Sequence, residues 1–391
     1  MAGRIGLIVN PIAGTGGRAG LHGTDGWDRL TEALNRGGAA VSTPRAARTL
    51  RRLAHRAGVR VLAAPGIMGT DVASASGIAA QALTMEMPAE GQTTAAHTRE
   101  AARLLASEGV DLLVFAGGDG TARDVVQAVG SAQPVLGIPC GVKMRSGVFA
   151  TSPEAAAEVA ARFLSSPERI RADAEVLDSA TDRELGTEFY AMATVPGVAA
   201  AMLAGPKTSS LTGSPAELDA LCAAVAGDLR PDDLYLVGPG MTTLRVLRHL
   251  GLAGSAMGVD AVRDGQLVGV DLSDRAILQL MDQAAVTRLI LGVIGGQGFL
   301  LGRGNQQLSQ EVLARLGPDD VHIIASAAKL AALQPPRLLV DAGDETAFDW
   351  ISGYHRVRVG RARYMMMQVV SAASADTARP AKDTDNRAAE E

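Results

Sequence analysis

The feature that most constrains the fold of this sequence is an apolar run that leads into glycines around one aspartate. The run extends from Asp111 to Ala116, and the residues after it are Gly117-Gly118-Asp119-Gly120-Thr121. A helical stretch follows from about Ala122 to Val129 and closes at Gly130. A strand that turns directly into a helix is the repeating unit of α/β folds, so the segment predicts a parallel sheet with crossover helices.

The same alternation continues on both sides of this segment. In the first part, the predicted strands are Arg4–Val9, Val59–Ala64 and Pro134–Ile138. The predicted helices are Thr43-Pro44 to Gly58, Thr98–Ser107, and Ser152-Pro153 to Leu164. In the second part, we expect the strand Leu234–Val237, the helix Thr242–Leu250, alternation over His322–Val340, and a hairpin of Tyr354–Val359 with Arg363–Val370. This pattern predicts an α/β phosphate-binding domain over 1–155, a second domain over 156–370, and a disordered tail over 371–391.

Composition narrows the class of protein. Hydrophobic residues make up 47% and aromatic residues only 3%, so the core must be aliphatic, as in buried parallel sheets. A formal net charge of -5 argues against a general nucleic-acid binder. The two cysteines, Cys140 and Cys222, cannot build a disulfide framework or a cysteine zinc site. The chain starts directly with a strand, and its apolar runs are too short to span a bilayer, so we expect a cytoplasmic protein.

The segment around Asp119 has the chemistry of a phosphate site. Its glycines let the backbone approach a ligand, and the helix start favours an anion. Thr121 and Asp124 have the spacing of a capping box, which predicts that the helix begins there. Asp119 can accept a proton from an attacking hydroxyl or hold Mg²⁺ on nucleotide phosphates. The alternative is a plain strand-to-helix turn in which Asp119 only caps the helix.

The glycine turn resembles the signature shared by NAD kinases with diacylglycerol and sphingosine kinases. In that superfamily the aspartate is regarded as catalytic and the turn binds phosphates, which implies that role for Asp119. Both branches also tend to end their first strand with Asn-Pro before a glycine-rich loop. Asn10-Pro11-Ile12-Ala13-Gly14-Thr15-Gly16-Gly17 is similar. The resemblance implies a Rossmann-like N-terminal domain, and a second domain that closes the nucleotide cleft.

Further segments resemble the predicted ATP- or polyphosphate-dependent NAD kinases related to protein X of acetoin-catabolism clusters. They are Gly20–Gly26, Gly137–Met144, Leu236–Thr243, and Gly295–Phe299 running on to Gly302–Gln307. The likeness reaches to about Val370. The Asn-Glu pair and the Gly-Ser-Thr-Ala-Tyr-like segment of the widespread NAD kinases are not found, and His22 stands where a lysine is expected.

The candidate binding residues follow from these segments. Those expected to contact the nucleotide or its phosphates are Asn10, Gly14, Gly117, Gly118, Gly120, Thr121, Lys143, Gly238, Gly240, Thr242, Thr243, Arg303 and Asn305. For Thr242 and Thr243 a helix cap is an equal explanation. For Arg303 and Asn305 a solvated loop is the alternative, and for Lys143 a surface lysine. No residue is assigned to a metal.

The resemblance therefore implies a kinase that phosphorylates a hydroxyl, most specifically the ribose 2′-OH of NAD, with ATP or polyphosphate as donor and Mg²⁺. Asp119 would orient or deprotonate the hydroxyl. The alternatives are a kinase for another acceptor, such as a lipid or small metabolite, and a non-catalytic nucleotide-binding regulatory protein. We expect a homo-oligomer with a small-molecule substrate, no nucleic-acid partner and no membrane span.

Overall fold

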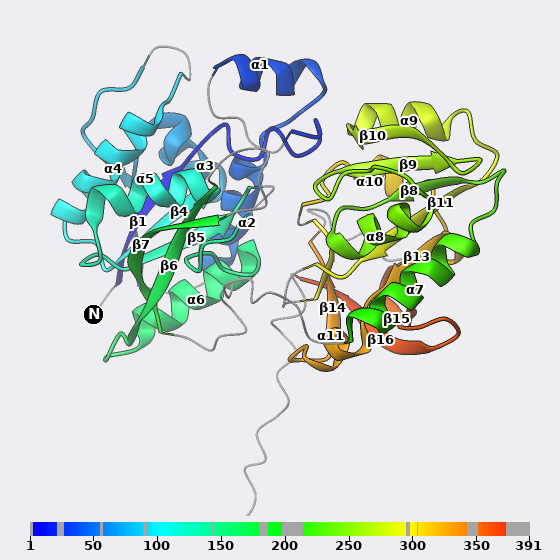
Figure 1. The fold of residues 1–391 in the computed structure, drawn as a ribbon. Coiled ribbons are helices and arrows are strands. Elements are labelled where there is room, and N and C mark those ends of the chain that lie inside the picture. Colours follow the sequence, from blue (N-terminus) through cyan, green and yellow to red (C-terminus); the bar gives the residue numbers. More distant parts are fainter. Residues whose placement is uncertain are drawn as a thin grey trace, which may run out of the picture.

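The computed structural model has two parts, each built around its own sheet (Figure 1). It describes residues 3–21, 27–54, 58–88, 92–141, 144–179, 187–197, 214–294, 298–302, 304–341 and 351–372. The predicted disordered tail lies outside the described residues from position 373 onward. The mixed α/β class expected from the sequence is confirmed.

The first sheet has five parallel strands in the order β3-β2-β1-β4-β5. In chain order they are β1 Gly3–Val9, β2 Val59–Ala63, β3 Ala80–Ala82, β4 Leu112–Gly117 and β5 Val135–Pro139. The helices of this part are α1 Trp27–Asn35, α2 Ser42–Ala54, α3 Thr70–Ala75, α4 Ala95–Ser107, α5 Asp119–Val129 and α6 Pro153–Ser165, with a 3₁₀ turn at Gly66–Met68. Successive β1 side chains pack into different clusters, with Leu7 facing α2 and α6 and Ile8 facing α4 and α5. Helices therefore cover both faces, which explains why the strands are continuous apolar runs.

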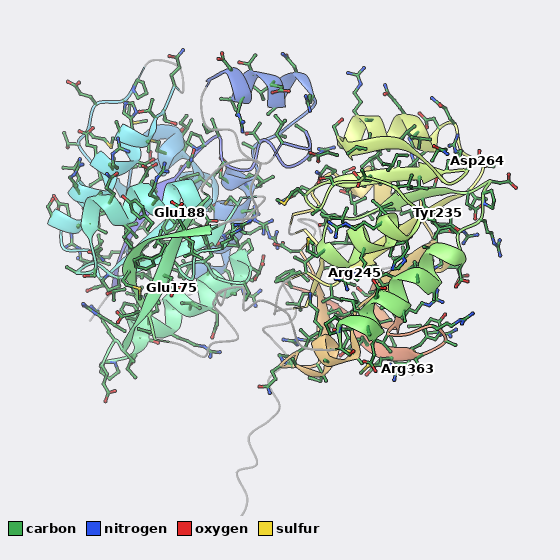
Figure 2. All side chains as sticks on the ribbon, in the orientation of Figure 1. Glu175, Glu188, Tyr235, Arg245, Asp264 and Arg363 are labelled. Carbon is green, nitrogen blue, oxygen red and sulfur yellow. The ribbon has the colours of Figure 1, made fainter. Side chains whose placement is uncertain are left out.

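An antiparallel hairpin extends the first part beyond α6. Its strands are β6 Arg171–Ser179 and β7 Thr187–Pro196, marked by the labels of Glu175 and Glu188 in Figure 2. Val176 and Val195 are buried in one cluster with the sheet residue Phe115. The boundary predicted at residue 155 falls inside α6, whose whole length packs on the first sheet. We therefore propose that the first domain continues through β7.

The second sheet has nine strands in the order β10-β9-β8-β11-β13-β15-β16-β14-β12. They are β8 Leu234–Val237, β9 Val259–Arg263, β10 Gln266–Leu272, β11 Thr287–Gly292, β12 Phe299–Leu301, β13 Val321–Ile324, β14 Arg337–Val340, β15 Gly353–Arg358 and β16 Tyr364–Ser371. Its helices are α7 Pro215–Gly227, α8 Met241–His249, α9 Asp274–Met281, α10 Gln310–Leu313 and α11 Ala327–Ala331, with a 3₁₀ turn at Pro318–Asp320. The predicted hairpin is confirmed, because β15 and β16 pair antiparallel.

Charged side chains join the two parts. Arg18, in the loop after β1, pairs with Asp274 at the start of α9. Arg45 on α2 pairs with Asp341, which follows β14 and has a fully buried side chain. Arg48 lies 3.6 Å from the same carboxylate. These pairs bring the loop after β1, and helix α2, against the second domain.

Candidate active site

The glycine turn after β4 lies at the centre of the first sheet. β1 and β4 are neighbouring parallel strands, with Val9 opposite Ala116. The chain crosses from β1 toward β2 but from β4 toward β5, so the direction of the strand order reverses between them. Ligands of open α/β sheets bind at such a switch point, beyond the carboxyl ends of the strands. Asn10 directly follows β1, and Asp119 lies two residues after the end of β4.

Asn10 connects the loop after β1 to the first turn of α5. Its side-chain amide donates to the hydroxyl of Thr121 at 3.0 Å, and its Oδ1 accepts the N–H of Ile12 at 3.3 Å. Thr121 is buried against Gly117, where an added Cβ would lie 2.4 Å from the Cβ of Thr121. Only glycine at position 117 allows the helix to start so close to the strand. The structure thus brings together three of the predicted site residues.

The predicted capping box is wrong. Gly118 is the N-cap and α5 begins at Asp119, three residues earlier than the sequence suggested. The hydroxyl of Thr121 is engaged by the loop after β1, and Asp124 accepts a hydrogen bond from Arg99 of α4 at 2.8 Å. Local spacing was overridden by these longer-range contacts. As a result Asp119 is the first residue of the helix, where the helix dipole favours a negative charge.

Three donors hold the carboxylate of Asp119. The backbone N–H of Arg145 donates to Oδ2 at 2.8 Å, and the backbone N–H of Ser146 donates to Oδ1 at 3.0 Å. The hydroxyl of Ser146 donates to Oδ1 at 2.6 Å. Asp119 and the following Gly120 are both partly exposed, so this turn reaches the protein surface. The carboxylate is therefore fixed in direction at the switch point.

The environment of Asp119 changes its proton affinity. Burial raises the pKa of the carboxyl above its ordinary value, because the charged form loses solvation. The hydrogen bonds from Ser146 and Arg145, and the positive charge of Arg145, act in the opposite direction. The net effect is a raised pKa. A carboxylate with a raised pKa is a stronger base and is suited to take a proton from a hydroxyl.

Two other predicted glycines are needed for close packing. Gly14 has a φ of +83°, and a Cβ there would lie 2.3 Å from Val41 and 2.5 Å from the carbonyl oxygen of Cys140. A Cβ on Gly118 would lie 3.3 Å from the Cα of Gly141. The loop after β1, the turn after β4 and the end of β5 therefore meet at one edge of the sheet.

The second predicted glycine turn lies between β8 and α8. Gly240 has a φ of +133° and is the N-cap of α8. Thr243 is fully buried, and its hydroxyl donates to the carbonyl of Gly240 at 2.9 Å, which stabilises the helix start. Gly238 packs against β11, and Thr242 lies beside Gly292 at the end of that strand. These four predicted residues lie together, but on a different sheet from Asp119.

Asn305 holds its own loop. It is 1% exposed, its Oδ1 accepts the N–H of Gly302 at 2.9 Å, and its side-chain amide donates to the carbonyl of Leu300 at 2.7 Å. The neighbouring Gln306 reaches the first domain, where its amide lies 3.5 Å from the carbonyl oxygen of Gly141. Asn305 thus shapes the loop that meets the first domain, and its contact with the ligand stays a prediction.

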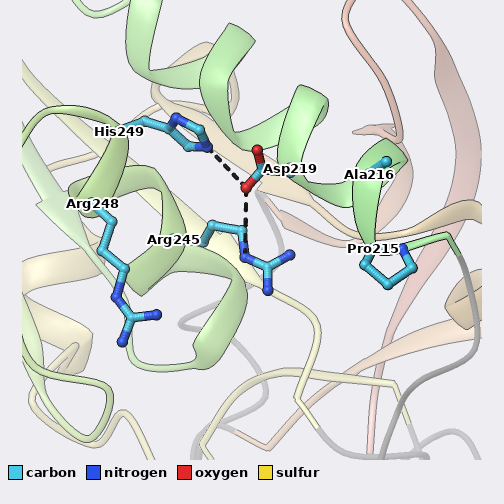
Figure 3. Close-up of a pocket in the computed structure, with 6 residues that line it drawn as sticks. All are labelled: Pro215, Ala216, Asp219, Arg245, Arg248 and His249. Carbon is cyan, nitrogen blue, oxygen red and sulfur yellow. Dashed lines mark hydrogen bonds and ion pairs between the residues drawn. The ribbon is translucent and has the colours of Figure 1, made fainter.

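A surface pocket lies between α7 and α8 (Figure 3), and these helices are far from α5, which carries Asp119 (Figure 1). It is lined by Pro215, Ala216, Asp219, Arg245, Arg248 and His249. Asp219 lies 3.1 Å from Nε2 of His249 and 4.0 Å from Nε of Arg245. These contacts connect α7 to α8, so we infer that Asp219, Arg245 and His249 stabilise the packing of the two helices and are not part of the Asp119 site.

In the part of the chain that the structure describes, no three or more His, Cys, Asp or Glu residues lie close enough to hold a metal ion. Within the same residues, no helix combines the length and the apolar character that crossing a membrane requires.

Two contacts of Asp119 were missed from the sequence. Arg145 and Ser146 lie more than 25 residues further along the chain, and no local pattern marks them. Only the return of the chain along β5 brings them to the start of α5. Two other predicted phosphate contacts, Lys143 and Arg303, lie outside the described residues.

Comparison with known proteins identifies both halves of the molecule. Residues 5–168 match the ATP-NAD kinase N-terminal domain, and residues 232–369 match the ATP-NAD kinase C-terminal domain. A search of the curated proteins found no match. The N-terminal domain match precedes the C-terminal one along the sequence, and together they span most of the chain. The chain belongs to the NAD kinase-like family and is a phosphotransferase.

Proposed function

We propose that this kinase transfers a phosphoryl group from ATP or polyphosphate to the ribose 2′-hydroxyl of NAD, with Asp119 as the base. The carboxylate takes the proton of the ribose hydroxyl while the hydroxyl oxygen bonds to the terminal phosphorus of the donor. The bond between that phosphorus and the rest of the donor breaks, and the shortened donor leaves with the electron pair. The observation that carries the proposal is the carboxylate of Asp119, held by three donors at the switch point of the first sheet.

The surrounding turns suit the donor phosphates. The start of α5, with Gly117, Gly118 and Gly120, lies at the same edge of the sheet as Asn10 and Gly14, and the first N–H groups of a helix are free to bind a ligand. Such N–H groups bind phosphate, and positioning with charge neutralisation accounts for most of the catalysis in phosphoryl transfer. The turn from Gly238 to Thr243 would hold phosphates from the second domain.

Mg²⁺ fits this scheme as a companion of the donor. Protein sites for Mg²⁺ usually supply one or two carboxylates and leave the remaining ligands to phosphates and water. The described residues offer no larger cluster of acidic side chains. We therefore propose that Mg²⁺ enters on the donor phosphates, where it would neutralise their charge.

We further propose that the enzyme acts in the cytoplasm as a homo-oligomer.

The test is NADP⁺ formation by the purified protein given NAD⁺, Mg²⁺ and either ATP or polyphosphate. Asp119→Asn should lower kcat by at least about 100-fold, because the base is lost. The matched control is Asp282→Asn, which changes an exposed carboxylate in the second domain and should retain wild-type turnover.

Each outcome has a definite meaning. Substantial turnover by the Asp119→Asn protein would remove Asp119 from the chemistry. If the wild-type protein binds nucleotide but forms no NADP⁺ from either donor, the acceptor assignment is wrong. The assay then moves to lipid and small-metabolite hydroxyls with the same pair of variants.

A further inference from the structure

Ser146 is the side chain that contacts Asp119 most closely. Its hydroxyl lies 2.6 Å from Oδ1 and its backbone N–H lies 3.0 Å from the same oxygen. Ser146 is fully buried, although serine usually lies at the surface. A buried hydroxyl needs partners, and the nearest one here is a negative charge.

The direction of the hydroxyl proton follows from the remaining contacts. The backbone N–H of Leu177, on β6, donates to the Ser146 oxygen at 3.0 Å and occupies one of its lone pairs. The proton then has two acceptors within reach, the carbonyl oxygen of Leu177 at 3.3 Å and the carboxylate of Asp119 at 2.6 Å. The charged and closer acceptor forms the stronger bond, so the proton points at Asp119.

The hairpin holds this serine in place. Ser146 contacts Leu177 of β6. Gly147, the residue after Ser146, donates its backbone N–H to the carbonyl of Glu175 at 2.8 Å. Glu175 is labelled on β6 in Figure 2. The two donors on Ser146 are therefore anchored to β6, and not to the helix that carries Asp119. The position of the carboxylate thus depends on the packing of the hairpin against the first domain.

We propose that Ser146 is a positioning residue that aims the Asp119 carboxylate and keeps it ready to accept a proton. This inference rests on the proposed function, in which Asp119 is the base. Without the hydroxyl, Oδ1 keeps only the backbone N–H of Ser146, and the carboxylate can turn away from the acceptor. The same hydrogen bond opposes the effect of burial on the pKa of Asp119, so its loss raises that pKa further. Among the described residues, the charged group that also acts on this carboxylate is Arg145, and the neighbouring acidic residue of α5, Asp124, is paired with Arg99.

The test compares Ser146→Ala with Ser152→Ala. Ser152 is also fully buried, and it accepts a backbone N–H at the start of α6, so the two variants lose the same group in different places. Ser146→Ala should lower kcat by about tenfold or more, with KM little changed, because a misdirected base affects the chemical step. It should also move the acid limb of the pH–rate profile to higher pH. Ser152→Ala should leave kcat and the acid limb unchanged. Ser146→Thr, which keeps the hydroxyl, should have a higher kcat than Ser146→Ala.

A second measurement does not need turnover. Protein labelled with ¹³C at the aspartate carboxyl carbons, with Asp119→Asn to assign the signal, reports the pKa of Asp119 directly. It should be higher in Ser146→Ala than in the wild type. An unchanged Asp119 titration would overturn the proposal, even in an active enzyme. A shifted titration in a protein that makes no NADP⁺ would keep the role of Ser146 and reject the acceptor. If Ser146→Ala does not fold, Ser146→Cys, with a weaker donor of similar size, should shift the titration in the same direction.

Discussion

The protonation of Asp119 is decided by a balance between opposing contacts. Burial raises the pKa of this carboxyl, and the hydrogen bonds from Ser146 and Arg145 only partly offset the increase. The pKa of an exposed aspartate is about 3.9. The folded protein therefore holds the Asp119 proton to higher pH than the unfolded chain does. Ionising Asp119 therefore lowers the free energy of unfolding as the pH rises through its folded-state pKa. Only the ionised form can accept a proton from the substrate hydroxyl.

This balance predicts the pH dependence of the enzyme. As the pH rises, kcat/KM for NAD⁺ at saturating donor should increase through an acid limb above the range of an exposed aspartate. The rate should then stay level while Asp119 is ionised. The comparison uses ATP and polyphosphate in turn, since a limb caused by the donor would move when the donor changes. If the acid limb shifts when the donor is changed, the pH dependence comes from the donor and not from Asp119.

At the scale of elements, glycine turns determine how the strands and loops meet. The turn after β12 contains Gly302, whose φ is +87°. A Cβ at that position would lie 1.8 Å from the backbone oxygen of Asp341, at the end of β14. A side chain cannot rotate away from a backbone atom so close to its Cβ. The turn must therefore move before any other residue fits there.

Gly302→Ala should lower the free energy of unfolding by at least about 2 kcal/mol, because it adds a backbone clash to an unfavourable φ. Gly37→Ala is the matched control, since Gly37 has a φ of +82° and nothing within 4 Å of its added Cβ. It should cost only about 1 kcal/mol. Urea unfolding of both variants gives the comparison, and equal losses would contradict the role assigned to the Asp341 contact.

For the whole molecule, a buried ion pair connects the two domains. Burial alone would lower the pKa of Arg45, but Asp341, together with Cys140 and Glu154, outweighs the effect of burial and raises it. Arg45 is only 12% exposed in its side chain, and Arg48 contacts the same carboxylate. Removing one member of a buried pair leaves the other charge without compensation, which costs more than the pair contributes when intact.

Asp341→Asn should destabilise the protein by about 3 kcal/mol and increase hydrogen exchange along α2, where Arg45 lies. The control is Glu32→Gln, which removes an exposed pair with Arg36 on the surface of α1. That change should cost under about 0.5 kcal/mol. If both variants unfold at the same denaturant concentration, the Arg45–Asp341 pair does not stabilise the junction.

Much of the secondary structure could be predicted because it depends on local patterns. The strand at Leu234–Val237 was predicted to the residue, and the helix at α6 begins beside its predicted cap, Ser152. Glycines around Asp119 marked the turn because a close approach of helix and strand excludes a Cβ. The family was also recognisable from this turn together with the loop that contains Asn10. Periodicity and turn residues act within a few positions of the chain, so a sequence displays them directly.

The site itself was decided by the tertiary structure. Asn10 and Thr121 are 111 positions apart, and Asp119 and Ser146 are 27 apart, yet each pair forms a direct hydrogen bond. Thr121 was predicted to cap its own helix, but Asn10 binds its hydroxyl instead. Sequence alone determined which residues could carry the chemistry, since residue type and turn geometry are local. The fold decided which of them meet and how strongly Asp119 holds its proton, since burial and long-range hydrogen bonds exist only after the sheet has brought distant strands together.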